Sequence, residues 1–263
     1  MTEYTGRGDP ARSLAILWRT GERASRKGKP DLSVDLIVRA AIEVADAEGI
    51  AALSMRKVAE RLGVGTMSLY TYVPGKAELL DVMLDTVCGE VAMPEDVPGG
   101  WRGRLELIAR ENLALFQRHP WMSQVSASRP PLGPNIVAKY DYELRAVDGI
   151  GLDDLEMDSV ITLIDGYVAG AARGAVEAAQ AEGSTGMTDE EWWYAHSPFF
   201  AKVFDPARYP IATRVGAAAG EAHNAAYDPR HAFEFGLQRV LDGIETFIGS
   251  HAVRPAESGD AER

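Results

Sequence analysis

The feature that most constrains this chain is the spacing of its apolar residues, which repeats every three to four positions over most of its length. Residues 33–48 show the pattern clearly, with apolar side chains at Ile37, Ala40, Ala41, Val44 and Ala45. Such a stripe is typical of an amphipathic helix. Ser33 suits the N-cap of this helix and Gly49 suits the position after its end. No segment shows a convincing strand pattern, so we predict an all-α fold.

Two short helices separated by a glycine form the most informative motif. The first is predicted from Ser54 to Leu62 and the second from Gly65 to Tyr72, with the turn at Gly63. A glycine suits this turn because it adopts a positive φ without a Cβ clash. With the helix of residues 33–48 packed before them, these segments predict a helix-turn-helix unit. The bland alternative is a helical corner with no ligand.

The outward residues of the second short helix favour DNA as its ligand. They carry hydroxyl groups and apolar atoms but hardly any charge, which is unusual for a solvated helix face. Hydroxyls can bond bases or phosphates in the major groove, and an apolar side chain can meet the thymine methyl. Lys76 follows the Pro74-Gly75 break and starts the next helix, where a cation and free N–H groups suit a phosphate.

Charge and chain breaks divide the sequence into four parts. The first 80 residues carry a net charge of +2 and the rest carry −14. Pro94, Pro98 and the Gly99-Gly100 pair mark a break after the first group of helices. We expect a flexible basic arm (1–30), a helix-turn-helix domain (31–80), a helical ligand-binding and dimerisation domain (81–249) and a disordered tail (250–263). Arg26, Lys27 and Lys29 of the arm are candidate DNA contacts, although a solubilising tail would have a similar composition.

A family resemblance supports this interpretation. The run LSMRKVAERLGVGTMSLYTYVPGKAELL, residues 53–80, closely resembles the DNA-binding domain of the TetR family of transcriptional regulators. The segments WRGRL (101–105), SRPPLGPN (128–135), FEFGL (233–237) and DGIE (242–245) resemble the ligand-binding domain of its tetracycline-repressor branch. The resemblance implies an N-terminal three-helix DNA-binding domain, a larger helical domain and a dimer.

The resemblance also implies roles for individual residues. Candidates for reading base edges are Arg56, Thr66, Met67 and Tyr70, and Ser68 lies on the same outward face. Candidates for phosphate contacts are Ser54, Tyr72 and Lys76. Arg56 could instead be merely solvated, and Tyr72 could instead be a core residue.

Departures from the branch bear on the effector. Tetracycline repressors hold a drug–magnesium chelate with histidines, and at two of those positions this chain has Val125 and Ala92. We therefore expect no metal and no cofactor, and a small apolar effector bound by aromatic side chains. The candidate pocket residues are Phe116, Trp121, Tyr140, Trp192, Trp193, Phe199 and Phe200. For each of them, a place in the packed core is the alternative.

Glycines at helical spacing indicate a dimer interface. Gly166, Gly170 and Gly174 recur every fourth residue, and each costs about 0.5–1 kcal/mol within a helix unless a partner approaches closely. On the last helix we expect Gly236, Leu237, Val240 and Gly243 to face the same partner. A close contact within one chain is the alternative.

Together these patterns predict a cytoplasmic, non-enzymatic homodimer that binds operator DNA and that a small molecule releases, with repression favoured over activation. No apolar run approaches the ~18 residues of a membrane span, and no set of residues forms a catalytic constellation. Two alternatives stay open. One is a helical ligand-binding or catalytic protein with a vestigial DNA domain. The other is a nonspecific architectural DNA binder, against which the acidic body argues.

Overall fold

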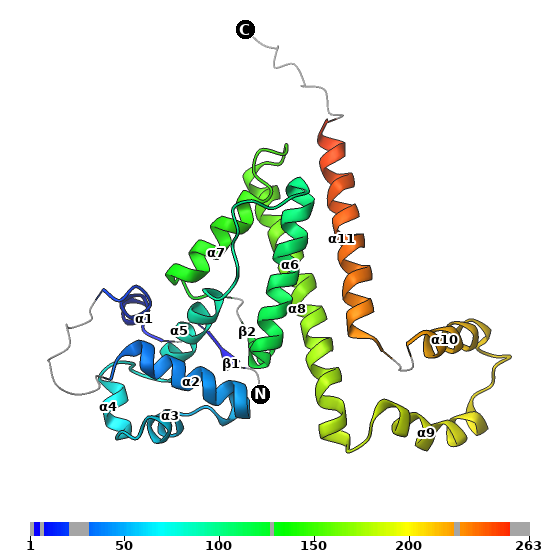
Figure 1. The fold of residues 1–263 in the computed structure, drawn as a ribbon, viewed down its shortest axis with the longest axis horizontal. Helices are drawn as coiled ribbons and strands as arrows, with labels where there is room; N and C mark the ends of the chain where they lie inside the picture. The colour runs from blue at the N-terminus through cyan, green and yellow to red at the C-terminus, as the bar shows by residue number, and fades with distance from the viewer. Residues whose placement is uncertain (1–2, 6–7, 21–31, 127–128, 224–226, 253–263) are drawn as a thin grey trace, which may run out of the picture.

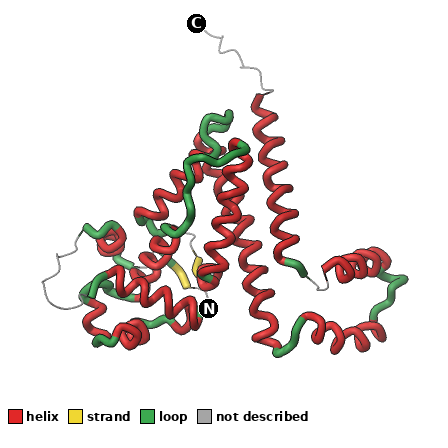
Figure 2. The backbone as a smooth tube through the Cα atoms, in the orientation of Figure 1, coloured by secondary structure: helices red, strands yellow, loops and turns green. Residues whose placement is uncertain are grey.

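The chain forms an all-α fold, as the sequence predicts (Figures 1 and 2). The computed structural model describes residues 1–263 except 1–2, 6–7, 21–31, 127–128, 224–226 and 253–263. The α-helices are α1 (Pro10–Leu17), α2 (Val34–Glu48), α3 (Met55–Leu62), α4 (Thr66–Tyr70), α5 (Lys76–Cys88), α6 (Gly100–Arg118), α7 (Pro134–Arg145), α8 (Asp154–Thr185), α9 (Asp189–Val203), α10 (Pro210–His223) and α11 (Pro229–Ala252). Two short 3-10 helices, η1 (Ile50–Ala52) and η2 (Pro120–Gln124), and a two-residue parallel pairing of β1 (Glu3–Tyr4) with β2 (Val125–Ser126) complete it.

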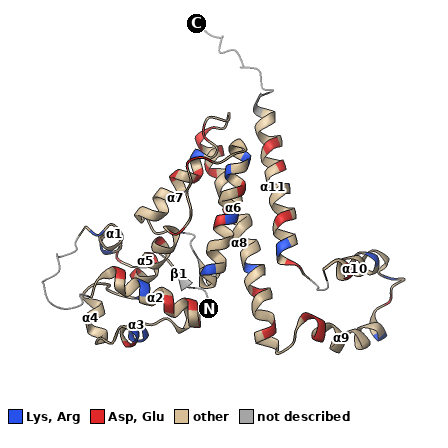
Figure 3. Cartoon of the chain, in the orientation of Figure 1, with Lys and Arg blue, Asp and Glu red and all other residues tan. Residues whose placement is uncertain are grey.

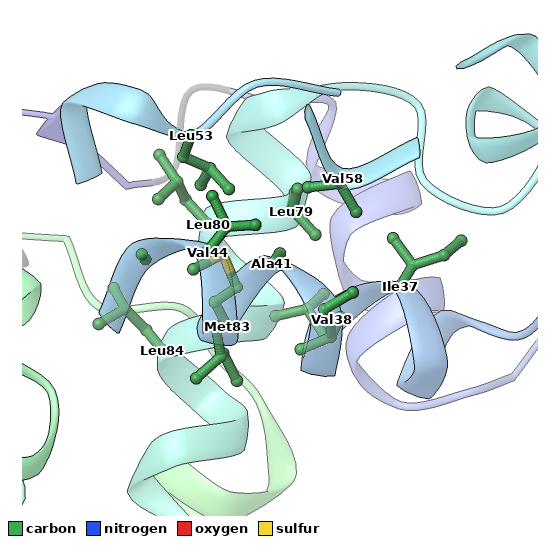
Figure 4. Close-up of a cluster of buried hydrophobic side chains, with 14 of the residues drawn as sticks. Ile37, Val38, Ala41, Val44, Leu53, Val58, Leu79, Leu80, Met83 and Leu84 are labelled. Atoms are coloured by element: carbon green, nitrogen blue, oxygen red, sulfur yellow. The ribbon is translucent and has the colours of Figure 1, made fainter. Parts of the chain in front are cut away.

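Helices α2 to α5 share the first of two hydrophobic cores (Figure 4). Ile37 and Ala41 of α2, Val58 of α3 and Leu79 and Met83 of α5 are fully buried there. The sequence prediction for α2 is confirmed, because the Ser33 hydroxyl accepts a hydrogen bond from the Leu36 N–H at 3.2 Å and Gly49 follows the last turn.

The N-terminal segment differs from the expected flexible arm over its described residues. Residues 10–17 form α1, which packs on α5 and buries Leu17 in the first core. The Asp9 carboxylate caps the helix by accepting from the Arg12 N–H at 2.9 Å, and Trp18 donates its indole N–H to the Leu132 carbonyl at 2.8 Å. The basic composition of the segment gave no sign of this short helix. Arg26, Lys27 and Lys29 lie outside the described residues.

A second core joins α6, α8 and α11 with the end of α7. Leu105, Ile164, Leu237 and Leu241 are fully buried in it. Helix α6 contributes to both cores, because Leu115 near its end is buried with the residues of α2 and α5. The body and the small domain therefore pack directly against each other through α6.

Helices α9 and α10 project away from the body as an arm between α8 and α11 (Figure 1). Thr188 and Glu191 form a capping box at the start of α9, because the side chain of each accepts a hydrogen bond from the other's backbone N–H. None of the residues of α9 or α10 is buried within the chain. The arm leaves several aromatic side chains exposed, including Trp193 and Phe199.

Leu17→Ala tests whether α1 is part of the fold. We expect it to lower the free energy of unfolding by about 2–5 kcal/mol, because it removes a buried side chain and leaves a cavity. Leu14→Ala on the same helix is the matched control, since Leu14 is 41% exposed. Urea unfolding followed by circular dichroism measures both. Equal, small effects would mean that α1 does not pack on α5 in solution.

Candidate DNA-reading interface and its junction with the body

The turn between α3 and α4 has the geometry that the sequence predicts. The Ser54 hydroxyl caps α3 by accepting from the Lys57 N–H at 3.2 Å. Gly63 ends the helix with φ 67° and ψ 30°, a left-handed conformation in which a Cβ would be strained. The Val64 N–H then bonds the Ala59 carbonyl at 3.0 Å, which reverses the chain toward α4.

Helix α4 presents one buried and one exposed face. Leu69 is fully buried and anchors the helix to the first core, as does Val73 just after it. On the other face Met67 is 77% exposed and Tyr70 is 43% exposed. Ser68 is also exposed and Thr66 partly so, which places all four predicted contact residues of this helix at or near the surface.

The predicted contacts outside α4 are also at least partly exposed. Arg56 on α3 has a side chain that is 82% exposed and lies 3.5 Å from Glu60 one turn on. Tyr72 is 37% exposed, so the alternative that it is a core residue is wrong, and its neighbour Val73 fills that place. Lys76 is the first residue of α5 and is partly exposed.

Two other basic residues of α3 have a different role. Lys57 forms an ion pair with Glu48, and Arg61 lies 2.7 Å from Glu43, so both connect α3 to α2. Figure 3 shows basic positions on α3 in blue and acidic positions on α2 in red. Exposed pairs of this kind contribute about 0–1 kcal/mol each. Among the described residues, the pairing leaves Arg56 as the α3 cation with no ion pair to another helix.

A partly buried polar junction connects the small domain to the body, with the carboxylates of Asp46 and Glu90 at the surface and His119 and Trp121 inside. Asp46 on α2 accepts a hydrogen bond from the Trp121 indole N–H at 2.8 Å. The same Asp46 oxygen lies 2.8 Å from Nδ1 of His119, whose Nε2 lies 3.0 Å from a Glu90 oxygen. Trp121 and His119 are 1% and 6% exposed. No sequence pattern points to this junction, because Asp46, Glu90 and His119 lie far apart in the chain.

The structure does not bring the predicted effector residues together. Trp121 is buried in the first core, where it packs with α2 and α5, and Phe116 is partly buried against the second core. Tyr140, Trp192, Trp193, Phe199 and Phe200 are exposed on α7 and α9. Within one chain these aromatic residues therefore form no common pocket. A groove of about 420 Å³ between α6, α8 and the start of α11 has other walls, including Leu113, Ala114 and Ala171.

The predicted interface glycines divide into two groups. A Cβ on Gly236 would lie 2.5 Å from the Tyr167 hydroxyl, and Leu237 beside it is fully buried. A Cβ on Gly174 would likewise lie 3.0 Å from the Tyr227 hydroxyl. These three positions serve contacts within the chain, which corrects the expectation that they face a partner. Val240 is partly buried against the second core. Gly166, Gly170 and Gly243 face open space.

Two further properties concern the described residues alone. They contain no group of three or more histidine, cysteine or acidic side chains able to hold a metal ion. No helix among them combines the length and apolar composition that a bilayer crossing requires.

Comparison with known proteins agrees with this architecture. Residues 37–83 match the family described as bacterial regulatory proteins, tetR family, and residues 93–248 match the tetracyclin repressor-like C-terminal domain. The HTH-type transcriptional repressor DrrR1 of Streptomyces coeruleorubidus is 49% identical over 94% of this chain and 90% of its own length.

Solved structures show the same fold. Apo ActR from Streptomyces coelicolor superposes with a TM-score of 0.68 at 27% identity, over 85% of this chain and 99% of that one. ActR in complex with actinorhodin gives a TM-score of 0.68 over 83% and 97%. With its turn, its reading helix and its helical body in place, this chain belongs to the TetR family of transcriptional regulators.

Proposed function

We propose that this protein is a repressor that binds operator DNA as a homodimer through α3 and α4. The observation that carries the proposal is the exposed, nearly uncharged face of α4, held outward by the buried Leu69. Arg56, Thr66, Met67 and Tyr70 read base edges. Ser54, Ser68, Tyr72 and Lys76 bind phosphates or neighbouring groups of the groove.

Each proposed contact has a physical basis. A guanidinium such as that of Arg56 can donate two hydrogen bonds to a guanine. The Met67 side chain, 77% exposed, offers an apolar surface to a thymine methyl. Lys76 opens a 13-residue helix, where its charge adds to the free backbone N–H groups in attracting a phosphate.

The proposal of ligand-controlled repression rests on relatives. A relative with 49% identity is named a transcriptional repressor, and ActR has been solved with actinorhodin bound. We propose that a small molecule likewise binds the body of this protein and lowers its affinity for DNA. The sequence argument for an apolar effector loses its basis, because the aromatic residues behind it are spread over α6, η2, α7 and α9.

For the dimer we propose the face of α8 and α11 that surrounds the open glycines. Leu163 on α8 is 50% exposed and Phe247 on α11 is 40% exposed, and both line a shallow apolar groove with Gly243. Gly166 and Gly170 continue the same face of α8 at helical spacing. Two copies of this surface make a four-helix contact in which the glycines allow the backbones to approach closely.

The exposed aromatic residues of the α9–α10 arm fit the same proposal. Large apolar patches on a folded chain mark interaction surfaces. The arm leaves the body next to α8 and α11, so a partner bound to those two helices lies within its reach (Figure 1). We propose that the second copy covers part of the arm.

Substitutions should separate base reading from phosphate binding. Lys76→Ala should weaken binding to all sequences and lower the slope of the salt dependence by about one for each phosphate that the protein no longer neutralises. Arg56→Ala and Tyr70→Ala should each cost about 1–3 kcal/mol on the preferred sequence and little on random DNA. The preferred sequence comes from selection out of a random DNA pool, and fluorescence anisotropy gives the affinities.

Lys57→Ala is the matched control for Arg56→Ala, because Lys57 is engaged with Glu48. It should leave the sequence preference unchanged. Equally weakened binding to specific and random DNA in all variants would support a nonspecific architectural binder instead.

Leu163→Arg should separate the dimer into monomers at micromolar concentration, since it places a charge in the apolar contact and leaves it without a partner. Val137→Arg on α7 is the control, because Val137 is also exposed, at 45%. Sedimentation velocity measures the result. A Leu163→Arg dimer as stable as the wild type would refute this interface.

The Asp46 junction should be a strong determinant of stability. Asp46→Ala leaves the buried Trp121 N–H without its acceptor, so we expect the free energy of unfolding to fall by about 1–3 kcal/mol. Glu48→Ala, two residues away on α2, removes only an exposed ion pair and should cost less than about 1 kcal/mol. Chemical unfolding monitored by tryptophan fluorescence compares them, and equal effects would mean that the junction opens in solution.

A further inference from the structure

A buried polar cluster lies where α6, α7 and α8 meet, apart from both the DNA-reading face and the Asp46 junction. Asn112 on α6 is 4% exposed and Glu143 on α7 is 3% exposed. The Asn112 amide donates hydrogen bonds to Glu143 at 3.1 Å and to Asp165 on α8 at 3.0 Å. Such a cluster within a helical body is costly to bury and calls for a physical reason.

The carbonyl oxygen of Asn112 is the unusual atom in this cluster. It is buried and has no hydrogen-bond partner among the described residues. Turning the amide over would not help, because the carbonyl would then face two carboxylates and the NH₂ group would lose both acceptors. The two acids therefore fix the amide so that an unsatisfied acceptor remains. An unsatisfied buried acceptor is destabilising unless something donates to it.

The cluster also carries more negative than positive charge. Lys139 is hydrogen-bonded to Glu143 and lies 3.8 Å from Asp165, so one ammonium faces two carboxyl groups. Burial raises the pKa of Asp165 to about 6, although Lys139 and Asn112 act against this shift. The Asp165 side chain is 46% exposed, so the cluster reaches the surface at this residue. An incoming cation would meet Asp165 first.

The cluster lies on the part of α6 that joins the two hydrophobic cores. Asn112 lies on α6 between Ala109, which belongs to the second core, and Leu115, which belongs to the first. The end of α6 leads directly into His119 and Trp121 of the junction with α2. A ligand held at Asn112 therefore acts on the helix that both domains share.

We propose that this cluster binds the protonated amine of the small-molecule effector, which donates to Asn112 Oδ1 and is balanced by Asp165. The inference rests on the proposed function only in treating this ligand as the effector. An ammonium supplies both what the orphaned acceptor needs and what the charge imbalance favours. A carboxylate of the same shape is excluded, because it offers no donor and meets two acids.

The test uses matched pairs of amines and acids on full-length protein without DNA. The probes are 9-aminoacridine with acridine-9-carboxylate, phenethylamine with 3-phenylpropionate, and decylamine with decanoate. Calorimetry at pH 7.5 measures binding. We expect at least one amine to bind at least tenfold more tightly than its acid. If no amine binds, or if the acids bind equally well, the proposal is wrong.

Variants locate the site. Asn112→Leu and Asp165→Asn should each weaken amine binding tenfold or more, while the control Asp141→Asn, an exposed acid of α7, should leave it unchanged. Ala114→Trp, which fills the separate groove, should also leave it unchanged. Loss of binding in Ala114→Trp alone would assign the ligand to that groove and overturn the proposal. Unchanged binding in a folded Asn112→Leu protein would do the same, with the orphaned acceptor then serving a structural water.

DNA measurements keep the two proposals distinguishable. The Asn112→Leu and Asp165→Asn proteins should bind the selected DNA like the wild type but should no longer release it with the amine. Release that is unaffected in both variants would overturn the site. A wild-type protein that binds amines but no specific DNA would contradict the proposed function while leaving the site intact.

Discussion

Helix α6 is the element on which the rest of the structure depends, because it is buried in both hydrophobic cores. Its first half supplies Leu105 and Ile108 to the core with α8 and α11, and its last turns supply Leu115 to the core with α2 and α5. A protein core is packed so closely that a change in volume of one methylene group already affects the neighbouring side chains. The two cores are therefore connected directly through one packed helix.

The polar junction lies on the connection between the end of α6 and the reading domain. Asp46 holds both Trp121 and His119 against α2, and α2 is also tied to α3 by the Arg61–Glu43 pair. Contacts thus run from the end of α6 through α2 to α3, and α4 is fixed to α3 by the tight turn at Gly63. An effector changes DNA affinity only as far as it prefers one of two such arrangements, and the shared helix provides a route for that preference.

Local signals predicted local structure well and long-range contacts poorly. The caps at Ser33, Ser54 and Thr188 and the left-handed turn at Gly63 follow from side chains within a few residues, and all are present. The exposed face of α4 could also be predicted, because it depends on one short helix. The pocket could not, since periodicity shows that Trp121 faces a core but not which core. For the same reason, the spacing of Gly236 and Gly243 did not reveal that Tyr167 packs against Gly236.

Charge places a final constraint on how the reading domain meets DNA. The body carries most of the negative charge of the chain, so it repels the phosphate backbone at long range. Within α3, two of three cations are already engaged with acids of α2, which reduces the nonspecific attraction that this domain can exert. Under the proposed function, affinity therefore comes from short-range contacts around α4 and from Lys76, together with the basic residues Arg26, Lys27 and Lys29 of the N-terminal segment. A domain with little nonspecific attraction discriminates strongly between sequences, because the contacts that remain are the ones that depend on the bases.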